Sequence, residues 1–211
     1  MDSWTDYLRL SIGILAVVDP VGAIPVFLIA TEDETALQRK RTALIASLTM
    51  AVTLLVFAWV GEYILYVFGI GMPAFQVGGG ILLLLMSVSM LHAYPLGATH
   101  RPEEDEEARV KEAVGVVPLG IPLMAGPGSI ALVIMDSNLA PGVMHSVYLS
   151  LTILVIALLV WAVLRAAVPL GEKLGRTGIN TCTRLMGLIL AAIAVELIAA
   201  GMLKLFPGLG G

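Results

Sequence analysis

The residue best able to do chemistry in this sequence is an acid that stands alone in an apolar stretch. Asp19 opens the segment Asp19-Pro-Val-Gly-Ala-Ile-Pro25, and it is the only charged residue between Arg9 and Glu32. An uncharged apolar run of this length predicts a membrane span. An ionised acid at the centre of a span costs about 2.5–3.5 kcal/mol on insertion scales, so its presence there indicates a function.

Helix-breaking residues surround this acid. Pro20 and Pro25 each remove a backbone donor and Gly22 adds backbone freedom, so the sequence predicts a break in the first span. Inside a bilayer the freed carbonyls must face protein or a water-lined cavity. Asp-Pro-Val-Gly is also a good helix start, with Asp19 as N-cap and Pro20 as the first helical residue. Asp19 therefore either only caps the second half-helix or also titrates or binds a cation or a substrate ammonium.

A second break is predicted in the segment Val117–Ser129, which holds three prolines and three glycines in an uncharged run. A half-helix that begins near Gly128 would direct unpaired amides and the positive end of its dipole into the site, which suits a carboxylate. The hydroxyl of Ser129 would add a donor, while Asp19 and the carbonyls of residues 18–22 would take an ammonium group. The two breaks together predict a seat for a small zwitterionic amino acid, formed by Asp19, Pro20, Gly22, Pro25, Gly126, Pro127, Gly128 and Ser129.

Glu196 is the second acid predicted inside a span. Its neighbours in Ala191–Ala200 are small and apolar, so we expect a desolvated and neutral carboxyl group. Such a group either donates one hydrogen bond between helices or carries a proton. Counting along the uncharged runs places Asp19, Gly126 and Glu196 near the bilayer midplane, slightly toward the outside. Proton coupling through Asp19 and Glu196 is therefore a hypothesis, with sodium as the other candidate ion.

The elements that must position these residues follow from composition. The chain has 211 residues, of which 58% are hydrophobic and 13% are charged, and its mean hydropathy is +0.95. A soluble core of this size cannot bury so much apolar surface, so the sequence predicts a polytopic membrane protein. No basic n-region precedes the first span, which we expect to act as its own insertion signal. The single Cys182 excludes an intrachain disulfide and a cysteine metal site, and the net charge of −4 gives no reason to expect nucleic acid.

Uncharged runs predict six spans and an all-α fold. The third span follows a turn at Gly69–Pro73 and ends near Leu91. The other five are Arg9–Glu32, Arg41–Glu62, Glu112–Asp136, Asp136–Arg165 and Arg184–Lys204.

Basic residues predict the orientation of these spans. Ten of the twelve Lys and Arg residues follow spans one, three and five, and only Arg9 and Lys204 lie on the other side. By the positive-inside rule both termini face outward, in a multi-pass protein of the cell's inner membrane.

An internal repeat relates the two halves of the chain. A shift of 107 residues places Pro20 on Pro127 and Gly80 on Gly187, and it also aligns Gly13 with Gly120 and Gly71 with Gly178. Each repeat holds three spans, an odd number, so the halves must insert with opposite orientation. We therefore predict one integral membrane domain built from two inverted three-helix repeats, residues 1–104 with the inner loop and residues 105–211, with helices 1 and 4 discontinuous.

Three segments carry a resemblance to a known family. Asp19–Phe27, Phe75–Leu82 and Ile121–Ile130 resemble the MarC family of six-span inner-membrane proteins, and the resemblance covers essentially the whole chain. This family includes the SnatA-type transporters of small neutral amino acids and is grouped with the LysE-like exporters. The resemblance implies an inner-membrane protein and, for some members, movement of glycine, alanine and similar amino acids.

The expected function is secondary transport of a small neutral amino acid, without ATP, because the sequence has no nucleotide-binding motif. An exporter of another small solute or a drug and a non-transporting scaffold remain alternatives. An intramembrane enzyme is not expected, because Asp19 has no second aspartate to pair with and no Ser-His or metal motif is present. We expect no cofactor and no metal, and the sequence leaves the oligomeric state open.

Overall fold

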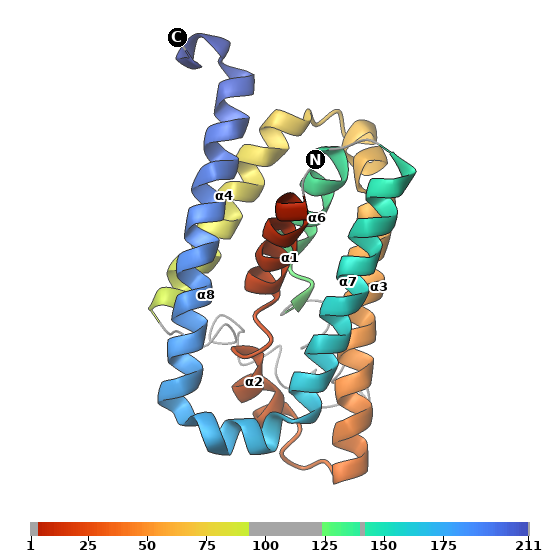
Figure 1. Ribbon diagram of the computed structural model, residues 1–211, viewed down its shortest axis with the longest axis vertical. Helices are drawn as coiled ribbons and strands as arrows, with labels where there is room; N and C mark the ends of the chain where they lie inside the picture. The colour runs from red at the N-terminus through yellow and green to blue at the C-terminus, as the bar shows by residue number, and fades with distance from the viewer. Residues whose placement is uncertain (1–3, 93–123, 140–141, 211) are drawn as a thin grey trace.

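The computed structural model describes residues 4–92, 124–139 and 142–210, and every regular element in these ranges is a helix (Figure 1). The predicted all-α class is therefore confirmed for the described residues. The helices are α1 (Trp4–Val18), α2 (Ala23–Ala30), α3 (Ala36–Val67), α4 (Met72–Leu91), α6 (Pro127–Leu139), α7 (Val143–Arg165), α8 (Ala167–Leu205) and the short 3-10 helix η2 (Pro207–Gly210).

Five segments within the described residues are long and apolar enough to cross a membrane, which makes this a multi-pass integral membrane protein. They are Leu10–Ala30, Ala36–Val67, Met72–Leu91, Val143–Arg165 and Ala167–Leu205. The predicted fourth span falls partly outside the described residues, and helix α6 is the part of it that the structure describes. The acidic cluster at 103–107 and half of the expected second break, residues 117–123, also lie outside the described residues.

Two helices extend well beyond the uncharged runs that predicted them. Helix α3 begins at Ala36 rather than near Arg41, because Thr35 and Gln38 form a capping box there. Helix α8 begins at Ala167 rather than near Arg184, so it includes the basic segment before Arg184, and it bends at Gly175, whose φ is 61°. The turn predicted between spans two and three is confirmed: α3 ends at Val67, and Gly69 has a φ of 66° before α4 begins.

Glycines allow α4 and α8 to run side by side (Figure 1). A β-carbon on Gly80 would lie 2.7 Å from Ile198 Cγ1 and 2.9 Å from the carbonyl oxygen of Ala194. A β-carbon on Gly187 would lie 2.9 Å from Met90 Cβ, so the backbones touch at both places and no larger residue fits. Within the run Gly78–Gly80, Gly79 and Gly80 pack closely on neighbouring helices, whereas Gly78 faces open space.

Helix α1 packs against several neighbours in the centre of the molecule (Figure 1). A β-carbon on Gly13 would lie 3.4 Å from Ile193 of α8 and 3.5 Å from Leu132 of α6. The outer faces of α3, α7 and α8 are apolar instead, as at Leu154 and Leu158 of α7, which suits contact with lipid. The break after α1 is thereby enclosed by protein on several sides.

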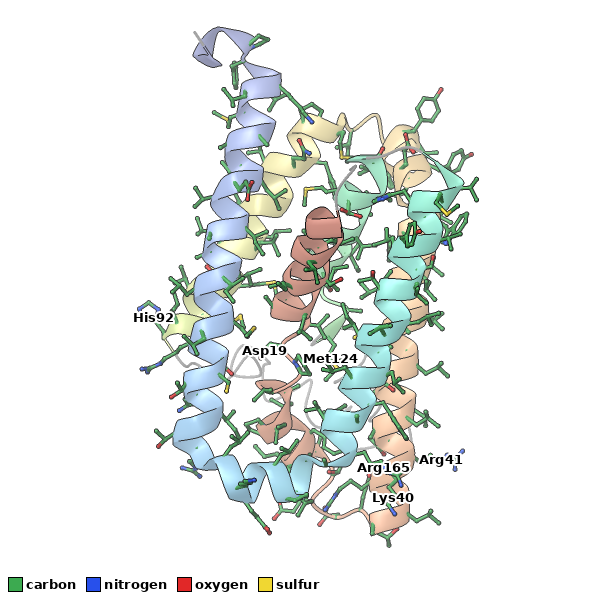
Figure 2. All side chains as sticks on the ribbon, in the orientation of Figure 1. Asp19, Lys40, Arg41, His92, Met124 and Arg165 are labelled. Carbon is green, nitrogen blue, oxygen red and sulfur yellow. The ribbon has the colours of Figure 1, made fainter. Side chains whose placement is uncertain are left out.

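The chain ends and three of the basic residues lie at opposite ends of the molecule. Figure 1 shows both termini at the same end, and Figure 2 shows Lys40, Arg41 and Arg165 at the other. Arg165 lies over the ring of Trp161, with its guanidinium carbon 5.3 Å from the ring centroid.

Candidate functional site

The candidate site begins at the break between α1 and α2. Helix α1 ends at Val18 and α2 begins at Ala23, and Asp19 between them has a φ of 37°. This left-handed backbone is uncommon for a residue with a side chain, although aspartate adopts it more readily than most. The Gly22 N–H donates to Asp19 Oδ1 at 3.1 Å, and the Ala23 N–H donates to the Asp19 carbonyl at 3.1 Å.

The cap of α2 differs from the sequence prediction. Gly22, and not Asp19, is the N-cap residue, so the half-helix starts three residues later than expected. Pro20 belongs to the turn before it instead of being the first helical residue. The Asp19 carboxylate still accepts from the amide three residues ahead, which stabilises this turn in the way a capping side chain stabilises a helix start.

The second carboxylate oxygen of Asp19 is left without a partner. Asp19 is 5% exposed, and Oδ2 accepts no hydrogen bond from any residue that the structure describes. Buried polar atoms in native proteins are nearly always paired, so an unpaired carboxylate oxygen points to a missing ligand, ion or proton. The side chain at the first break is thus half satisfied by the protein.

Thr183 of α8 faces the same spot. Its hydroxyl lies beside the Asp19 carboxylate without reaching hydrogen-bond geometry to Oδ2. A β-carbon on Gly22 would overlap Asp19 Oδ2 and would lie 2.8 Å from Thr183 Oγ1, so the three residues converge on one small space. Gly22 is required there because any side chain would fill the space between the two oxygens.

The carbonyl end of α1 adds further acceptors. The Ala16 carbonyl has no amide to accept from four residues ahead, because Pro20 has no N–H. The Gly22 N–H, which would otherwise bond the Val18 carbonyl, donates to Asp19 instead. No backbone donor within the described ranges bonds the carbonyls of Val17 and Val18 either. The first break therefore presents acceptors and the negative end of the α1 dipole.

The start of α6, where the sequence predicts the second break, presents donors. Helix α6 begins at Pro127, and the amides of Gly128 and Ser129 in its first turn bond no acceptor among the described residues. A β-carbon on Gly128 would lie 2.6 Å from Met86 Sδ, so this turn packs closely on α4. The Ser129 hydroxyl lies 3.1 Å from the Met124 carbonyl and 3.0 Å from the Gly126 carbonyl, to which it donates. Its proton is thus used within its own turn, which differs from the donor role expected of it.

The first break and the segment that leads into α6 lie at the same level of the molecule. Figure 2 shows Asp19 and Met124 at one height along the long axis, in the middle of the helical bundle. Leu132 of α6 packs on Gly13 of α1, so the two helices that carry the breaks are in contact. Asp19, Pro20 and Gly22 of the first break are buried or half-buried, and so are Gly126, Gly128 and Ser129 at the start of α6.

Two predicted prolines point elsewhere. Pro25 and Pro127 are both exposed. Pro127 lines an apolar cavity of about 560 Å³ between α3, α4 and α6, together with Phe57 and Phe75. Because their rings are exposed and do not share the enclosed space around Asp19, these two prolines contribute to the site only through the backbone conformation that they impose.

The expectation that Glu196 is a buried acid at the depth of Asp19 is wrong. Its side chain is exposed, whereas Ala194 two residues earlier is the buried position that packs on Gly80. Glu196 also lies thirteen residues above Thr183 on α8, which corresponds to roughly 20 Å at the rise of an α-helix. The sequence prediction counted the depth of Glu196 from Arg184, taken as the start of the span. The helix in fact begins at Ala167, so that count gave the wrong depth.

Sequence reasoning missed two polar features. One is Thr183 of α8, which faces Asp19. Thr181 on the same helix is exposed instead, and its hydroxyl donates to the Thr177 carbonyl. A buried pair between α6 and α7 was also missed: His145 Nε2 lies 3.0 Å from Asp136 Oδ2. Within the described residues no cluster of three or more His, Cys, Asp or Glu side chains could hold a metal ion.

The fold and this site define a class of protein, a multi-pass helical membrane protein with a polar break in its first span. The sequence matches the MarC family of integral membrane proteins over residues 4–206, and the chain belongs to that family.

Relatives of the chain come from bacteria and archaea. The UPF0056 membrane protein YhcE of Escherichia coli is 39% identical over 96% of this chain and 94% of its own length. The UPF0056 membrane protein PYRAB13050 of Pyrococcus abyssi is 38% identical over 92% of each chain. YvbG of Bacillus subtilis is 36% identical over 93% of each. No solved structure matches this chain.

Proposed function

We propose that the protein is a secondary transporter of small neutral amino acids such as glycine or alanine, held between the break after α1 and the start of α6. The observation that carries the proposal is the buried Asp19 carboxylate, whose Oδ2 has no partner among the described residues. An ammonium group would satisfy this oxygen, and the free amides of Gly128 and Ser129 would take the carboxylate of the same molecule.

A small cargo is favoured by what surrounds the break. Apolar side chains such as Val17, Val18 and Ile24 are buried next to it. Gly22 is held between Asp19 and Thr183 with no room for an added carbon. A cargo with a large or charged side chain would find neither space nor a counter-charge there, whereas glycine and alanine add at most one methyl group.

An inverted repeat, as part of this proposal, is supported by reciprocal contacts between α4 and α8. A β-carbon on Gly80 would meet the Ala194 carbonyl at 2.9 Å and the Ile198 amide at 3.2 Å. A β-carbon on Gly187 would meet the Ser87 carbonyl at 3.2 Å and the Leu91 amide at 3.4 Å. Each residue in the second set is shifted by 107 from its counterpart in the first. Such exchange of equivalent contacts is what a two-fold axis produces.

Pairs of corresponding spans also pack on one another: α1 on α6, α3 on α7 and α4 on α8. Under the 107-residue shift α3 and α4 meet their own counterparts, whereas α6 corresponds to α2 and meets α1 of the same span. Contact between corresponding spans across an axis in the membrane plane allows one half to rock against the other around a central site. This geometry favours a transporter over a scaffold, because a scaffold gains nothing from a buried, half-satisfied acid.

We place the protein in the inner membrane with both termini outside the cytoplasm. The placement in the inner membrane is supported by the family, whose members are integral membrane proteins, and by the bacterial relatives. The position of Lys40, Arg41 and Arg165 at the end opposite both termini supports the orientation, because basic residues collect on the cytoplasmic side. A cysteine accessibility assay at each end in intact cells tests this placement.

Coupling to protons or sodium is part of the proposal, with Asp19 as the group that would bind the ion. Glu196 is a weaker candidate, since it is exposed and far from the break. If the rate of amino acid uptake into vesicles changes with neither an imposed pH gradient nor an imposed sodium gradient, coupling to these ions is contradicted.

A second candidate function is export of a lipophilic solute or drug. The observation that favours it is the apolar cavity between α3, α4 and α6, which Phe57, Phe75 and Leu82 help to line. This cavity does not include Asp19, so a solute bound there would use a different part of the molecule.

Flux measurements in proteoliposomes test these functions together. Purified wild-type protein is expected to move radiolabelled glycine or alanine, and Asp19→Asn is expected to abolish this flux. A lipophilic cation tests the second candidate function, and its transport by Asp19→Asn at the wild-type rate would assign the apolar cavity instead. Absence of any amino acid flux by the folded wild-type protein would contradict the main proposal.

A further inference from the structure

The space at the first break is lined by acceptors of hydrogen bonds from two different helices. Asp19 Oδ2 comes from the break itself, and Thr183 Oγ1 comes from α8. The carbonyls of Val17 and Val18 end α1 at the same place and bond no backbone donor in the described ranges. The carboxylate and the hydroxyl share one small space, and the unpaired carbonyls stand one and two residues before Asp19 in the chain.

The Thr183 hydroxyl is directed at the Asp19 carboxylate and interacts with it. The hydroxyl of Thr181 on the same helix instead donates to the Thr177 carbonyl at 2.8 Å. A threonine in a helix commonly bonds the carbonyl one turn earlier when nothing else is offered. Thr183 is half-buried and faces Asp19 across the α-carbon of Gly22.

We propose that Thr183 is a specificity-determining residue, which together with Asp19 and the carbonyl end of α1 forms a seat for a primary ammonium group. An –NH₃⁺ group has three donors in a compact arrangement, and three acceptors around it satisfy them all. This inference rests on the proposed transport of amino acids and names the group by which the site selects its cargo.

The seat discriminates by the number of N–H donors. Each methyl group on the nitrogen removes a donor, leaves one buried acceptor unpaired and needs space that the α-carbon of Gly22 occupies. Glycine is therefore expected to bind best, N-methylglycine less well and trimethylglycine least. The same oxygens could instead hold an alkali cation, so the experiment must separate the two ligands.

The test compares glycine uptake by the purified, full-length protein in proteoliposomes. Thr183→Val removes only the hydroxyl, Thr183→Ser retains it, and Thr181→Val removes a hydroxyl from the same helix outside the seat. We expect Thr183→Val to raise the KM for glycine about 10- to 100-fold, the effect of losing one hydrogen bond to a charged group. Thr183→Ser and Thr181→Val are expected to stay close to wild type.

Competition on the wild-type protein needs no variant and covers the case in which Thr183→Val does not fold. Unlabelled glycine, N-methylglycine and trimethylglycine are expected to inhibit uptake in that descending order. Equal inhibition by trimethylglycine and glycine would overturn the inference. So would a Thr183→Val protein whose only change is a weaker dependence on sodium, measured against choline, because the seat would then hold the alkali cation.

Failure of this inference is distinguishable from failure of the proposed function. Wild-type protein that moves glycine, with a Thr183→Val variant of unchanged KM, overturns the role of Thr183 alone. Wild-type protein that moves no amino acid overturns both.

Discussion

The break after α1 and the start of α6, where the sequence predicts the second break, are built from similar residues and present opposite chemistry. Asp19-Pro20 at the first break corresponds to Gly126-Pro127 at the second under a shift of 107 residues. The first break leaves acceptors unpaired, namely Asp19 Oδ2 and the carbonyls that end α1. The second leaves the amides of a helix start unpaired.

The difference follows from which end of a half-helix meets the centre of the molecule. A helix that ends there presents carbonyls, and a helix that begins there presents amides. The acid at the first break adds to the acceptor character of its carbonyls. A site formed between such breaks is complementary to a molecule that carries both an ammonium and a carboxylate, which is why the comparison points to a zwitterion.

Removing the acid at the first break is expected to have the largest effect on transport. Asp19→Asn keeps the shape of the side chain but removes its negative charge, and we expect glycine flux to fall at least about 100-fold, or ~3 kcal/mol. The measurement is initial uptake in proteoliposomes. Asp33→Asn, an exposed acid in the turn after α2, is the matched control and should retain flux. Normal flux in Asp19→Asn would show that the first break needs no charge.

Adding a methyl group at the first break should reduce glycine flux more than adding one at the start of α6. Gly22→Ala places a carbon against Asp19 Oδ2, and we expect at least about a tenfold loss of flux because a buried carboxylate must shift. Gly128→Ala meets the flexible side chains of Met86 and Leu83, which can move, so its loss should be smaller. Gly78→Ala, which faces open space, is the control in the same assay. Equal losses in the first two variants would contradict the assignment of a tight seat to the first break.

Adding an acid at the start of α6 should weaken substrate binding there rather than create a second ammonium site like that of Asp19. An aspartate in Gly126→Asp would accept from the amides that begin α6 and would compete with the carboxylate of the cargo. We expect the KM for glycine to rise about tenfold, with Gly126→Ala as the control for size. A rise in KM that Gly126→Ala reproduces in full would mean that bulk alone is responsible.

The smallest effect is expected from Ser129. Because its hydroxyl donates to carbonyls of Met124 and Gly126, Ser129→Ala should cost about 1 kcal/mol of stability and reduce flux less than the changes above. Thermal unfolding in detergent and uptake in proteoliposomes measure the two effects. A loss of flux as large as that of Asp19→Asn would show that this hydroxyl contacts the cargo after all.

Much of the fold could be predicted because hydropathy and helix breakers act locally. The helical class, the membrane spans that the structure describes and the turn at Gly69 follow from uncharged runs and glycine positions. Helix limits were less predictable, since α3 and α8 continue through charged segments where capping and packing stabilise them. The acid at the first break was found because a lone charge in an apolar run is conspicuous.

What the sequence by itself determined is the position of Asp19 beside the prolines and glycine that break its span. Only the tertiary structure decided which residue of α8 faces that acid and whether the Glu196 side chain lies close to it. Side-chain direction on a helix changes by about 100° per residue, so Thr181 and Thr183 cannot be told apart without the neighbouring helices. The packing of α8 on α4 fixed that rotation, and with it turned Thr183 toward Asp19 and Glu196 away.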